Sequence, residues 1–535
     1  MTELPAWSTK LARPLHGGRT PMIQSKLIEA LQEASRFDHH VERFELHETH
    51  ISWVLLTGPF AYQIKTPVDL GFLDFSTLAA RKHYCEEELR LNRRLAPQLY
   101  RDVVAITGSP DDPHLGGNGP VFEYAVRMVE FPQAALLDRV QATGKLTLEH
   151  ADAMAHLVAE FHTGADVAAP DQPHGEPDLV FHPVRENFVQ IDPLLEVPAE
   201  RARLERLRDW SINRYHDLHD TLVQRKATGH IRECHGDLHL GNMLLDGDRV
   251  AAFDCLEFSP ALRWIDVQSD LAFLLMDLTE HGADTLARRL LDGYLALTGD
   301  YHGLALQPFY QVYRALVRAK VAAIRIDQSN GNHRELHDYL ALADRLRQAR
   351  QPFLLITHGL SGCGKSFISQ ALVERLGAVR LRSDVERKRL LGRTTDSVTL
   401  ESDKAVVYGH ETSVKTYDRL AELACTVIDS GTPAIVDATF LRHDQRARFM
   451  AMADELRVPF AILDIRAPEA LLAERVAHRA SAGHDPSEAG VDVIALQRNT
   501  VEPLKDAEAS RSITIDGAGP DLDRTIKQLS EVSVG

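Results

Sequence analysis

Residues 359–366, Gly-Leu-Ser-Gly-Cys-Gly-Lys-Ser, constrain the fold of this chain more than any other stretch. The apolar run 353–358 before them is typical of a buried parallel strand, and the segment 367–376 after them predicts a helix. A strand, a glycine-rich loop and a helix in this order let backbone amides wrap a phosphate group. The sequence therefore predicts an α/β P-loop domain with a parallel sheet flanked by helices.

The loop supplies the predicted nucleotide-binding residues of this domain. Its glycines let the main chain approach phosphate closely, its lysine would reach the β- and γ-phosphates of ATP, and its last serine would bind Mg²⁺. The predicted contacts are Gly359, Ser361, Gly362, Cys363, Gly364, Lys365 and Ser366. The stretch lacks the Gly-x-Gly-x-x-Gly pattern, so it implies no nicotinamide cofactor.

A second stretch, residues 235–254, carries a different set of polar residues. Asp237 lies five residues before Asn242, and Asp254 follows twelve residues after Asn242. Two short apolar runs joined by the polar turn 246–248 predict a hairpin, which returns Asp254 to the neighbourhood of Asn242. Their oxygen ligands suit Mg²⁺, and Asp237 can orient an acceptor hydroxyl, as phosphoryl transfer requires.

Residues 235–242 resemble the His-Gly-Asp-x-x-x-x-Asn loop of the aminoglycoside phosphotransferase and choline-kinase branch of the protein-kinase-like fold. The resemblance implies an α+β bilobal domain that uses ATP. It implies that Asp237 is catalytic and that Asn242 and Asp254 bind the metal. The turn 47–52 has no glycine, whereas protein kinases carry a glycine-rich loop there; aminoglycoside phosphotransferases often lack it.

In this family the third strand of the first lobe ends in a lysine that grips the nucleotide phosphates, which here is Lys65. A glutamate of the following helix holds that lysine, and Glu88 lies on the apolar stripe of the helix predicted around residues 84–95. The connector around Met128 is expected to meet the adenine. The alternating runs that fit the antiparallel sheet of this lobe are 41–47, 51–56 and 61–65.

Three features of the predicted second lobe leave alternatives open. Asp266 and Asp270 both qualify as the aspartate that braces the catalytic loop, although capping a helix also explains an aspartate there. Glu257 could add a carboxylate to the metal site. The predicted helix 307–327 is rich in Arg and Lys, which is typical of a solvated face; docking of an acidic acceptor is the alternative.

The strands after the P-loop resemble those of small kinases of the polynucleotide-kinase, zeta-toxin and gluconate-kinase group. The relevant runs are 379–383, 433–440 and 460–465. The resemblance implies that Asp384 activates the acceptor hydroxyl, that Asp437 belongs to the metal site, and that Arg475 and Arg479 meet the transferred phosphate. Arg387, one helical turn after Asp384, would hold a negative group of the acceptor.

The whole chain resembles a bacterial fusion of two kinase-type domains. The predicted boundaries are 1–350 for the kinase-like domain and 351–535 for the P-loop domain, with the lobes of the former at about 23–130 and about 131–350. The first hypothesis is two ATP- and Mg²⁺-dependent phosphotransferases acting on hydroxyl groups of small polar metabolites. Alternatively, one domain is a nucleotide-sensing regulator, or the P-loop domain phosphorylates nucleic-acid ends or nucleotide sugars.

The composition excludes several other classes of protein. The chain of 535 residues has no apolar run long enough to span a bilayer, and its first twenty residues do not resemble a signal peptide. Five scattered cysteines argue against a disulfide framework and favour a cytoplasmic location. The net charge of −17 argues against non-specific nucleic-acid binding. The local basic cluster at 380–389 is the feature that a nucleic-acid-end kinase would use.

Overall fold

The computed structural model describes residues 22–49, 51–71, 73–329, 333–394, 397, 407, 409–482 and 491–532. Side chains are not described at residues 22, 23, 327–329, 479–482, 491–493 and 532. The chain divides into two compact units. The first comprises Met1–Ala283 and Leu306–Gln348, and the second comprises Asp284–Ala305 and Ala349–Gly535. Each unit is therefore built from two separate stretches of chain.

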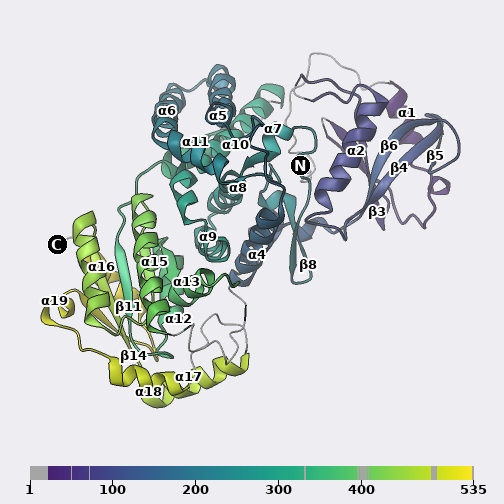
Figure 1. Ribbon diagram of the computed structural model, residues 1–535. Helices are drawn as coiled ribbons and strands as arrows, with labels where there is room; N and C mark the ends of the chain where they lie inside the picture. Colours follow the sequence, from purple (N-terminus) through teal and green to yellow (C-terminus); the bar gives the residue numbers. More distant parts are fainter. Residues whose placement is uncertain are drawn as a thin grey trace. The chain divides into compact units, whose positions relative to one another are not determined.

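The first lobe of the first unit is an antiparallel sheet in the order β1-β2-β3-β6-β4-β5. Its strands are β1 (Glu45–Glu48), β2 (Ser52–Leu56), β3 (Phe60–Lys65), β4 (Tyr100–Ser109), β5 (Asp112–Leu115) and β6 (Val121–Val129). Helices α1 (Met22–Ala30) and α2 (Leu78–Asn92) accompany the sheet (Figure 1). Side chains alternate between its faces: Trp53 and Leu55 pack with α1, and Val54 and Leu56 pack with Cys85 of α2.

The second lobe is mainly helical. Its helices are α3 (Leu137–Ala142), α4 (Leu148–Gly164), α5 (Pro177–Ile191), α6 (Pro198–Ala227), α7 (Pro260–Arg263), α8 (Val267–Glu280), α10 (Gln307–Ser329) and α11 (His333–Leu346). Its short strands are β7 (Ile231–Glu233), β8 (Met243–Asp246), β9 (Arg249–Ala252) and β10 (Trp264–Asp266). Strands β8 and β9 form the predicted hairpin, and α8 is buried from Val267 to Leu278. The predicted bilobal α+β architecture is confirmed.

The second unit contains a parallel sheet in the order β12-β13-β11-β14-β15. Its strands are β11 (Leu354–His358), β12 (Val379–Arg382), β13 (Ala434–Asp437), β14 (Phe460–Arg466) and β15 (Ser512–Asp516). The central strands β11, β13 and β14 are buried on both faces, as a sheet covered by helices requires. The predicted α/β domain is confirmed.

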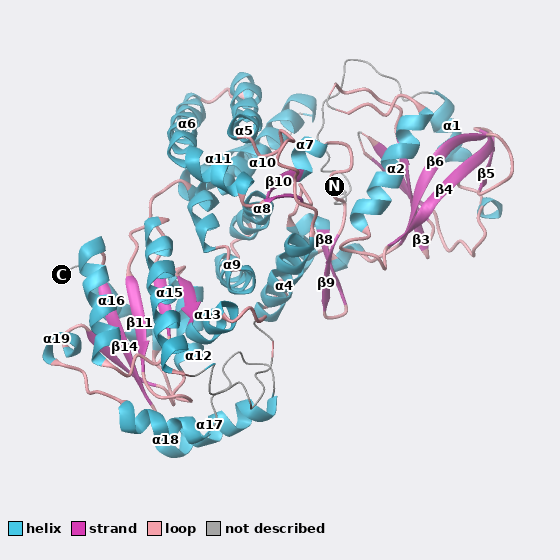
Figure 2. Cartoon of the chain, in the orientation of Figure 1, coloured by secondary structure: helices cyan, strands magenta, loops and turns pink. Residues whose placement is uncertain are grey.

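Helices cover both faces of this sheet, and Figure 2 shows its strands lying between them. Helices α12 and α20 share one apolar core with β11 and β14, whereas α15 and α16 pack against the sheet elsewhere. The helices after the P-loop are α12 (Lys365–Leu376), α13 (Ser383–Leu390), α15 (His410–Asp429), α16 (His443–Leu456), α17 (Glu469–Ala482), α18 (Val491–Thr500), α19 (Asp506–Ala509) and α20 (Leu522–Val532).

One helix of the second unit lies far from the rest of that unit in the sequence. Helix α9 (Asp284–Thr298) comes between α8 and α10, yet it packs against α12 and β12. The predicted boundary at residues 350 and 351 does not account for this segment. Amphipathic periodicity predicts that a helix buries one face, but it does not say which sheet that face will cover.

Glu233 joins the two lobes of the first unit. This residue ends β7 in the second lobe. Its carboxylate accepts hydrogen bonds from Arg90 of α2 at 2.8 Å and from Arg94, just after α2, at 3.2 Å. Arg263 of α7 donates to the same carboxylate at 3.1 Å. Burial alone would raise the pKa of Glu233, but the hydrogen bonds from Arg90 and Arg263 outweigh it and lower the pKa from 4.5 to about 2.

Glu233→Gln is expected to make unfolding less dependent on pH in the acid range. A carboxyl whose pKa is depressed by folding stabilises the protein above its unfolded-state pKa, and this stability is lost as the pH falls from 4.5 towards about 2. The thermal midpoint measured by circular dichroism across this range should therefore fall less steeply in the variant. Glu86→Gln, an exposed carboxyl on α2, is the control and should keep the parent slope.

Candidate active sites

Helices α8 and α10 fix the main chain of the loop that follows β7. The carboxylate of Asp270, in α8, accepts hydrogen bonds from the backbone amides of His235 at 3.0 Å and Gly236 at 2.8 Å. Arg314, in α10, donates to the carbonyl oxygen of Gly236 at 3.0 Å. Because these partners are buried, the loop has a fixed path.

These contacts settle two points that the sequence left open. Asp270 braces the loop, whereas Asp266 caps α8 by accepting from the amide of Gln268 at 2.8 Å and pairs with Arg225. The interpretation of 307–327 as a solvated basic face is wrong for Arg314, which is 5% exposed. Its guanidinium donates to the main chain of the loop, and composition does not reveal a contact with so distant a segment.

Asp237, Asn242 and Asp254 come together around the predicted hairpin. The side-chain amide of Asn242 donates to the carboxylate of Asp237 at 3.1 Å and to its carbonyl at 3.0 Å. The amide of Phe253 donates to the carbonyl of Asn242 at 2.9 Å, which places the next residue, Asp254, beside this group. Asp254 is buried and has a φ of 64°, a left-handed conformation that surrounding structure must enforce.

The donor set around Asn242 fits a divalent cation. The Oδ1 atom of Asn242 is buried and has no hydrogen-bond partner among the residues that the structure describes. A buried acceptor in this state costs free energy, and a cation bound by Asn242 and Asp254 would recover it. Amide and carboxylate oxygens are the ligands that Mg²⁺ prefers.

The carboxyl group of Asp237 is held in its ionised form. Burial raises its pKa, but the charges of His239 and His235 lower it by more, so the pKa lies well below its usual value. The Nε2 atom of His239 lies 3.6 Å from the Asp237 carboxylate. The ionised carboxylate can therefore accept a hydrogen bond from a hydroxyl group.

Lys65 is buried between two carboxylates. Its ammonium donates to Glu88 at 2.7 Å and to Glu257 at 2.6 Å. Lys65 shares a face of β3 with Ala61, which packs towards α2, and this explains why it meets Glu88. The sequence missed the bond to Glu257, whose carboxylate was expected near the metal.

An apolar cluster lies where the two lobes of the first unit meet. It joins Val54, Ala61 and Met128 of the first lobe to Leu244 and Phe253 of the hairpin. The side chain of Met128 is 2% exposed. Met128 lies opposite Ala61 in the sheet, so the connector predicted to meet the adenine is on the same face as Lys65.

The P-loop of the second unit runs from β11 to α12 through backbone conformations that require glycine. Gly359 has a φ of 142°, and a Cβ atom at this position would lie 2.5 Å from the carbonyl oxygen of Ile465. The ammonium of Lys365 donates to the carbonyls of Gly359 at 3.0 Å and Leu360 at 2.8 Å. The lysine therefore points into the loop, where a phosphate group would sit.

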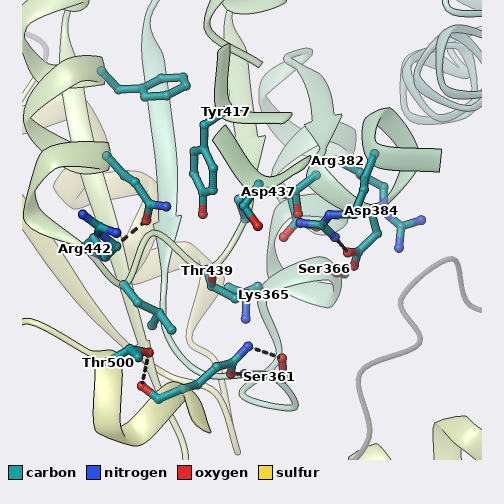
Figure 3. A pocket seen from close by; sticks show the side chains of 18 of the residues that line it. Ser361, Lys365, Ser366, Arg382, Asp384, Tyr417, Asp437, Thr439, Arg442 and Thr500 are labelled. Carbon is teal, nitrogen blue, oxygen red and sulfur yellow. Dashed lines mark hydrogen bonds and ion pairs between the residues drawn. The ribbon is translucent and has the colours of Figure 1, made fainter. Parts of the chain in front are cut away.

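A cavity of about 830 Å³ opens at the carboxyl ends of β11, β12 and β13. Figure 3 shows Asp384 and Ser366 on one side of it and Arg442 with Thr500 on the other. The predicted residues that line the cavity are Ser361, Gly362, Gly364, Lys365, Ser366, Asp384, Arg387, Asp437 and Arg475. Gly359 and Cys363 complete the loop behind them, and Cys363 is buried. Ligands bind at this edge in open α/β sheets.

Asp384 and Arg387 form an ion pair within the cavity wall. Arg387 donates to the carboxylate of Asp384 at 2.6 Å, one turn apart in α13. Across the sheet edge, Asp437 ends β13 and accepts from the hydroxyl of Ser369 at 3.2 Å. Asp437, at the end of β13, and Asp384, in α13 after β12, thus both line the cavity with the P-loop.

The two predicted arginines of α17 differ in what the structure describes. Arg475 donates to the carbonyl oxygen of Gly517 at 2.9 Å and lies 3.5 Å from that of Gly362. It therefore contacts the P-loop main chain. The side chain of Arg479 and the predicted loop 483–489 lie outside the described residues.

Sequence reasoning missed Gln497, which contacts the P-loop from α18. Its Oε1 atom accepts from the backbone amide of Ser361 at 2.9 Å, and its Nε2 atom donates to the Ser361 hydroxyl at 3.0 Å. The side-chain carbonyl oxygen of Gln497 thus occupies a position from which a phosphate oxygen could accept the same hydrogen bond. No local pattern marks this glutamine, because its contact depends on the packing of α17 and α18.

Several members of the basic cluster 380–389 are engaged within the unit. Arg380 pairs with Asp292, Lys388 donates to the carbonyl of Ser397 at 2.7 Å, and Arg389 donates to that of Ala296 at 2.6 Å. Arg380 is only 8% exposed. These partners leave the cluster poorly suited to follow a nucleic-acid backbone, which needs accessible cations.

Comparison with known proteins finds a family match for each part of the chain. Residues 72–306 match the phosphotransferase enzyme family, and residues 354–504 match the AAA domain family. The chain joins a phosphotransferase-family domain to a P-loop kinase-like domain. The phosphotransferase match supports the prediction that the fusion is a kinase-type enzyme.

The fusion has relatives of nearly its own length. Uncharacterised proteins of Mycobacterium bovis and Mycobacterium tuberculosis are each 29% identical over 498 residues, covering 91% of this chain and 95% of theirs. A gluconokinase from Sinorhizobium meliloti 1021 is 23% identical with a TM-score of 0.23, covering 34% of this chain and 95% of its own. Among the described helices of the fusion, none combines the length and apolarity needed to cross a bilayer.

Proposed function

We propose that each unit transfers the γ-phosphoryl group of ATP to a hydroxyl group of a small polar metabolite. The observation that carries this proposal is the arrangement of Asp237 and Asn242. An ionised carboxylate lies beside an amide whose Oδ1 atom is buried without a partner among the described residues. A base next to an amide oxygen that can bind a cation is what a kinase-type loop requires.

In the first site, separate residues would bind the metal, the phosphates, the adenine and the acceptor hydroxyl. Asn242 and Asp254 would hold Mg²⁺, which neutralises charge on the nucleotide phosphates when bound. Lys65, positioned by Glu88, would bind phosphate oxygens, and the adenine would lie against the apolar cluster around Met128. Asp237 would orient the acceptor hydroxyl and take its proton.

In the second site the P-loop amides and Lys365 would bind the β- and γ-phosphates, with Ser366 and Asp437 on the metal side. Asp384 lines the same cavity and would accept the proton of the attacking hydroxyl. Arg387 would bind an anionic group of the acceptor. Arg475 would keep the loop in shape through its contacts with Gly362 and Gly517.

The contact of Gln497 with Ser361 favours a second candidate for the P-loop unit alone. Gln497 accepts a hydrogen bond from an amide that would otherwise bind phosphate. In this candidate the unit is a nucleotide sensor, and nucleotide binding displaces Gln497 together with α18. Such a sensor would bind ATP without forming a product. Product formation therefore separates the two candidates.

The test is label transfer from γ-³²P-ATP to a fractionated metabolite extract, using the full chain. Asp254→Asn suits the left-handed backbone and should remove one set of labelled products by weakening Mg²⁺-nucleotide binding. Lys365→Ala should remove a different set. Joint loss from either variant would contradict two independent sites, and a Lys365→Ala variant that loses nucleotide binding but no product would favour the sensor.

A further inference from the structure

Helix α9 belongs to the phosphotransferase-family match and to the P-loop unit at the same time. The match covers residues 72–306, whereas Asp284–Ala305 forms part of the second compact unit. The first site therefore shares its family domain with a helix that packs on the second. This assignment raises the question of what α9 contributes there.

Asp292 attaches α9 to the edge of the parallel sheet. Strand β12 is an edge strand, and the backbone amide of Arg380 within it donates to Asp292 Oδ1 at 2.8 Å. The guanidinium of Arg380 also contacts Asp292 Oδ2 at 3.3 Å. Asp292 is 3% exposed, so this is a buried ion pair that also satisfies an edge amide.

The other end of Arg380 reaches the P-loop. Its Nη1 atom donates to the carbonyl oxygen of Ser366 at 3.0 Å, and its Nη2 atom donates to Gln370 in the same helix, α12. Ser366 is the serine expected to bind Mg²⁺. Arg380 thus connects α9 to the turn that would carry the metal ligand.

Two further contacts dock α9 on the elements of the second site. Arg288 donates to the carbonyls of Glu374 and Arg375, both at 2.9 Å, and so caps the C-terminus of α12. Arg389 of α13 donates to the carbonyl of Ala296 near the end of α9. The helix therefore touches both α12, which begins at the P-loop, and α13, which carries Asp384.

We propose that Asp292 is a positioning residue of the second site, because it orients Arg380 there; this inference rests on the function proposed for that site. It holds Arg380 on the Ser366 carbonyl and keeps this cation from the metal side of the cavity. A helix within the phosphotransferase-family match thereby determines the Mg²⁺ concentration that the P-loop unit needs to bind nucleotide.

The electrostatics of Arg380 support this role. Burial lowers its pKa, and the carboxylates of Asp292 and Asp437 oppose that effect. Without Asp292, the buried guanidinium would lose its ion-pair partner and would be attracted to Asp437. Asp437 is the carboxylate expected on the metal side, so Arg380 would then compete with Mg²⁺ for it.

The experiment measures binding of a fluorescent ADP analogue to the full chain across Mg²⁺ concentrations, in an Asp254→Asn background that weakens the first site. Asp292→Ala should raise the Mg²⁺ concentration for half-maximal binding by about 10-fold and leave binding in EDTA unchanged. Asp292→Asn keeps an acceptor for the Arg380 amide but lacks the charge, and should produce most of the shift. Thr285→Ala, on the exposed face of α9, is the control and should produce none.

Two results would overturn the role of Asp292. One is an unchanged Mg²⁺ dependence in both Asp292 variants. The other is equal weakening of binding with and without Mg²⁺, together with a lower thermal midpoint, which indicates a structural role alone. A different result would show that the P-loop unit is not a nucleotide site at all. In that case Lys365→Ala, in the same Asp254→Asn background, would bind the ADP analogue as well as the background variant does.

Discussion

Asp237→Ala is expected to slow phosphoryl transfer at the first site by about 10²- to 10⁴-fold, the usual contribution of a general base. The variant removes the carboxylate that would take the hydroxyl proton. Lys65, Asn242 and Asp254 remain, so the affinity for Mg²⁺-ATP should stay close to that of the parent. Single-turnover transfer to the first-site product and nucleotide titration measure the two quantities separately.

Asp237→Asn and Asp246→Ala complete this test. The asparagine keeps the size of the side chain and an oxygen for the Asn242 amide, so it should lose transfer while its thermal midpoint is preserved. Asp246 ends β8 and is exposed, and its replacement should leave transfer unchanged. Undiminished first-site product in either Asp237 variant would remove Asp237 from the mechanism.

Asp384→Asn is expected to reduce second-site transfer by a similar factor, about 10²- to 10⁴-fold. Arg382, and not Asp384, occupies the N-cap position of α13, and asparagine is tolerated in a first helical turn. The thermal midpoint should therefore change little. A normal single-turnover rate would end the catalytic assignment of Asp384.

The matched control for this variant is Asp418→Asn. Asp418 lines the same cavity from α15 and pairs with Arg448, so the substitution removes a comparable charge and ion pair. It should leave the rate of the chemical step unchanged and affect at most the acceptor KM. Equal loss of rate in both variants would indicate a general effect of cavity charge on transfer.

The site groups that sequence reasoning brought together correctly are those linked by short or regular elements. Asn242 and Asp254 follow from one hairpin, because alternation and a polar turn fix its register. Lys65 meets Glu88 because each lies on the apolar side of a periodic element. Their roles in binding and catalysis remain predictions.

What the sequence did not reveal depends on packing between distant segments. Glu257 binds Lys65 across 192 residues, and Gln497 binds Ser361 across 136 residues. The burial of Arg314 has the same origin. The sequence pattern of an amphipathic helix is the same whether its arginine donates to water or to a buried carbonyl oxygen. Periodicity reports how a segment is buried and gives no information about its partner.

The chain passes between its two compact units three times, at 283–284, 305–306 and 348–349. A gene divided near codon 349 would leave one product carrying the buried face of α9 without its sheet. The other product would have an uncovered β12 edge, a surface prone to pair with other chains. A chain divided at this point would therefore separate α9 from the strand and helix that it packs against, and only the undivided chain supplies every segment of both units.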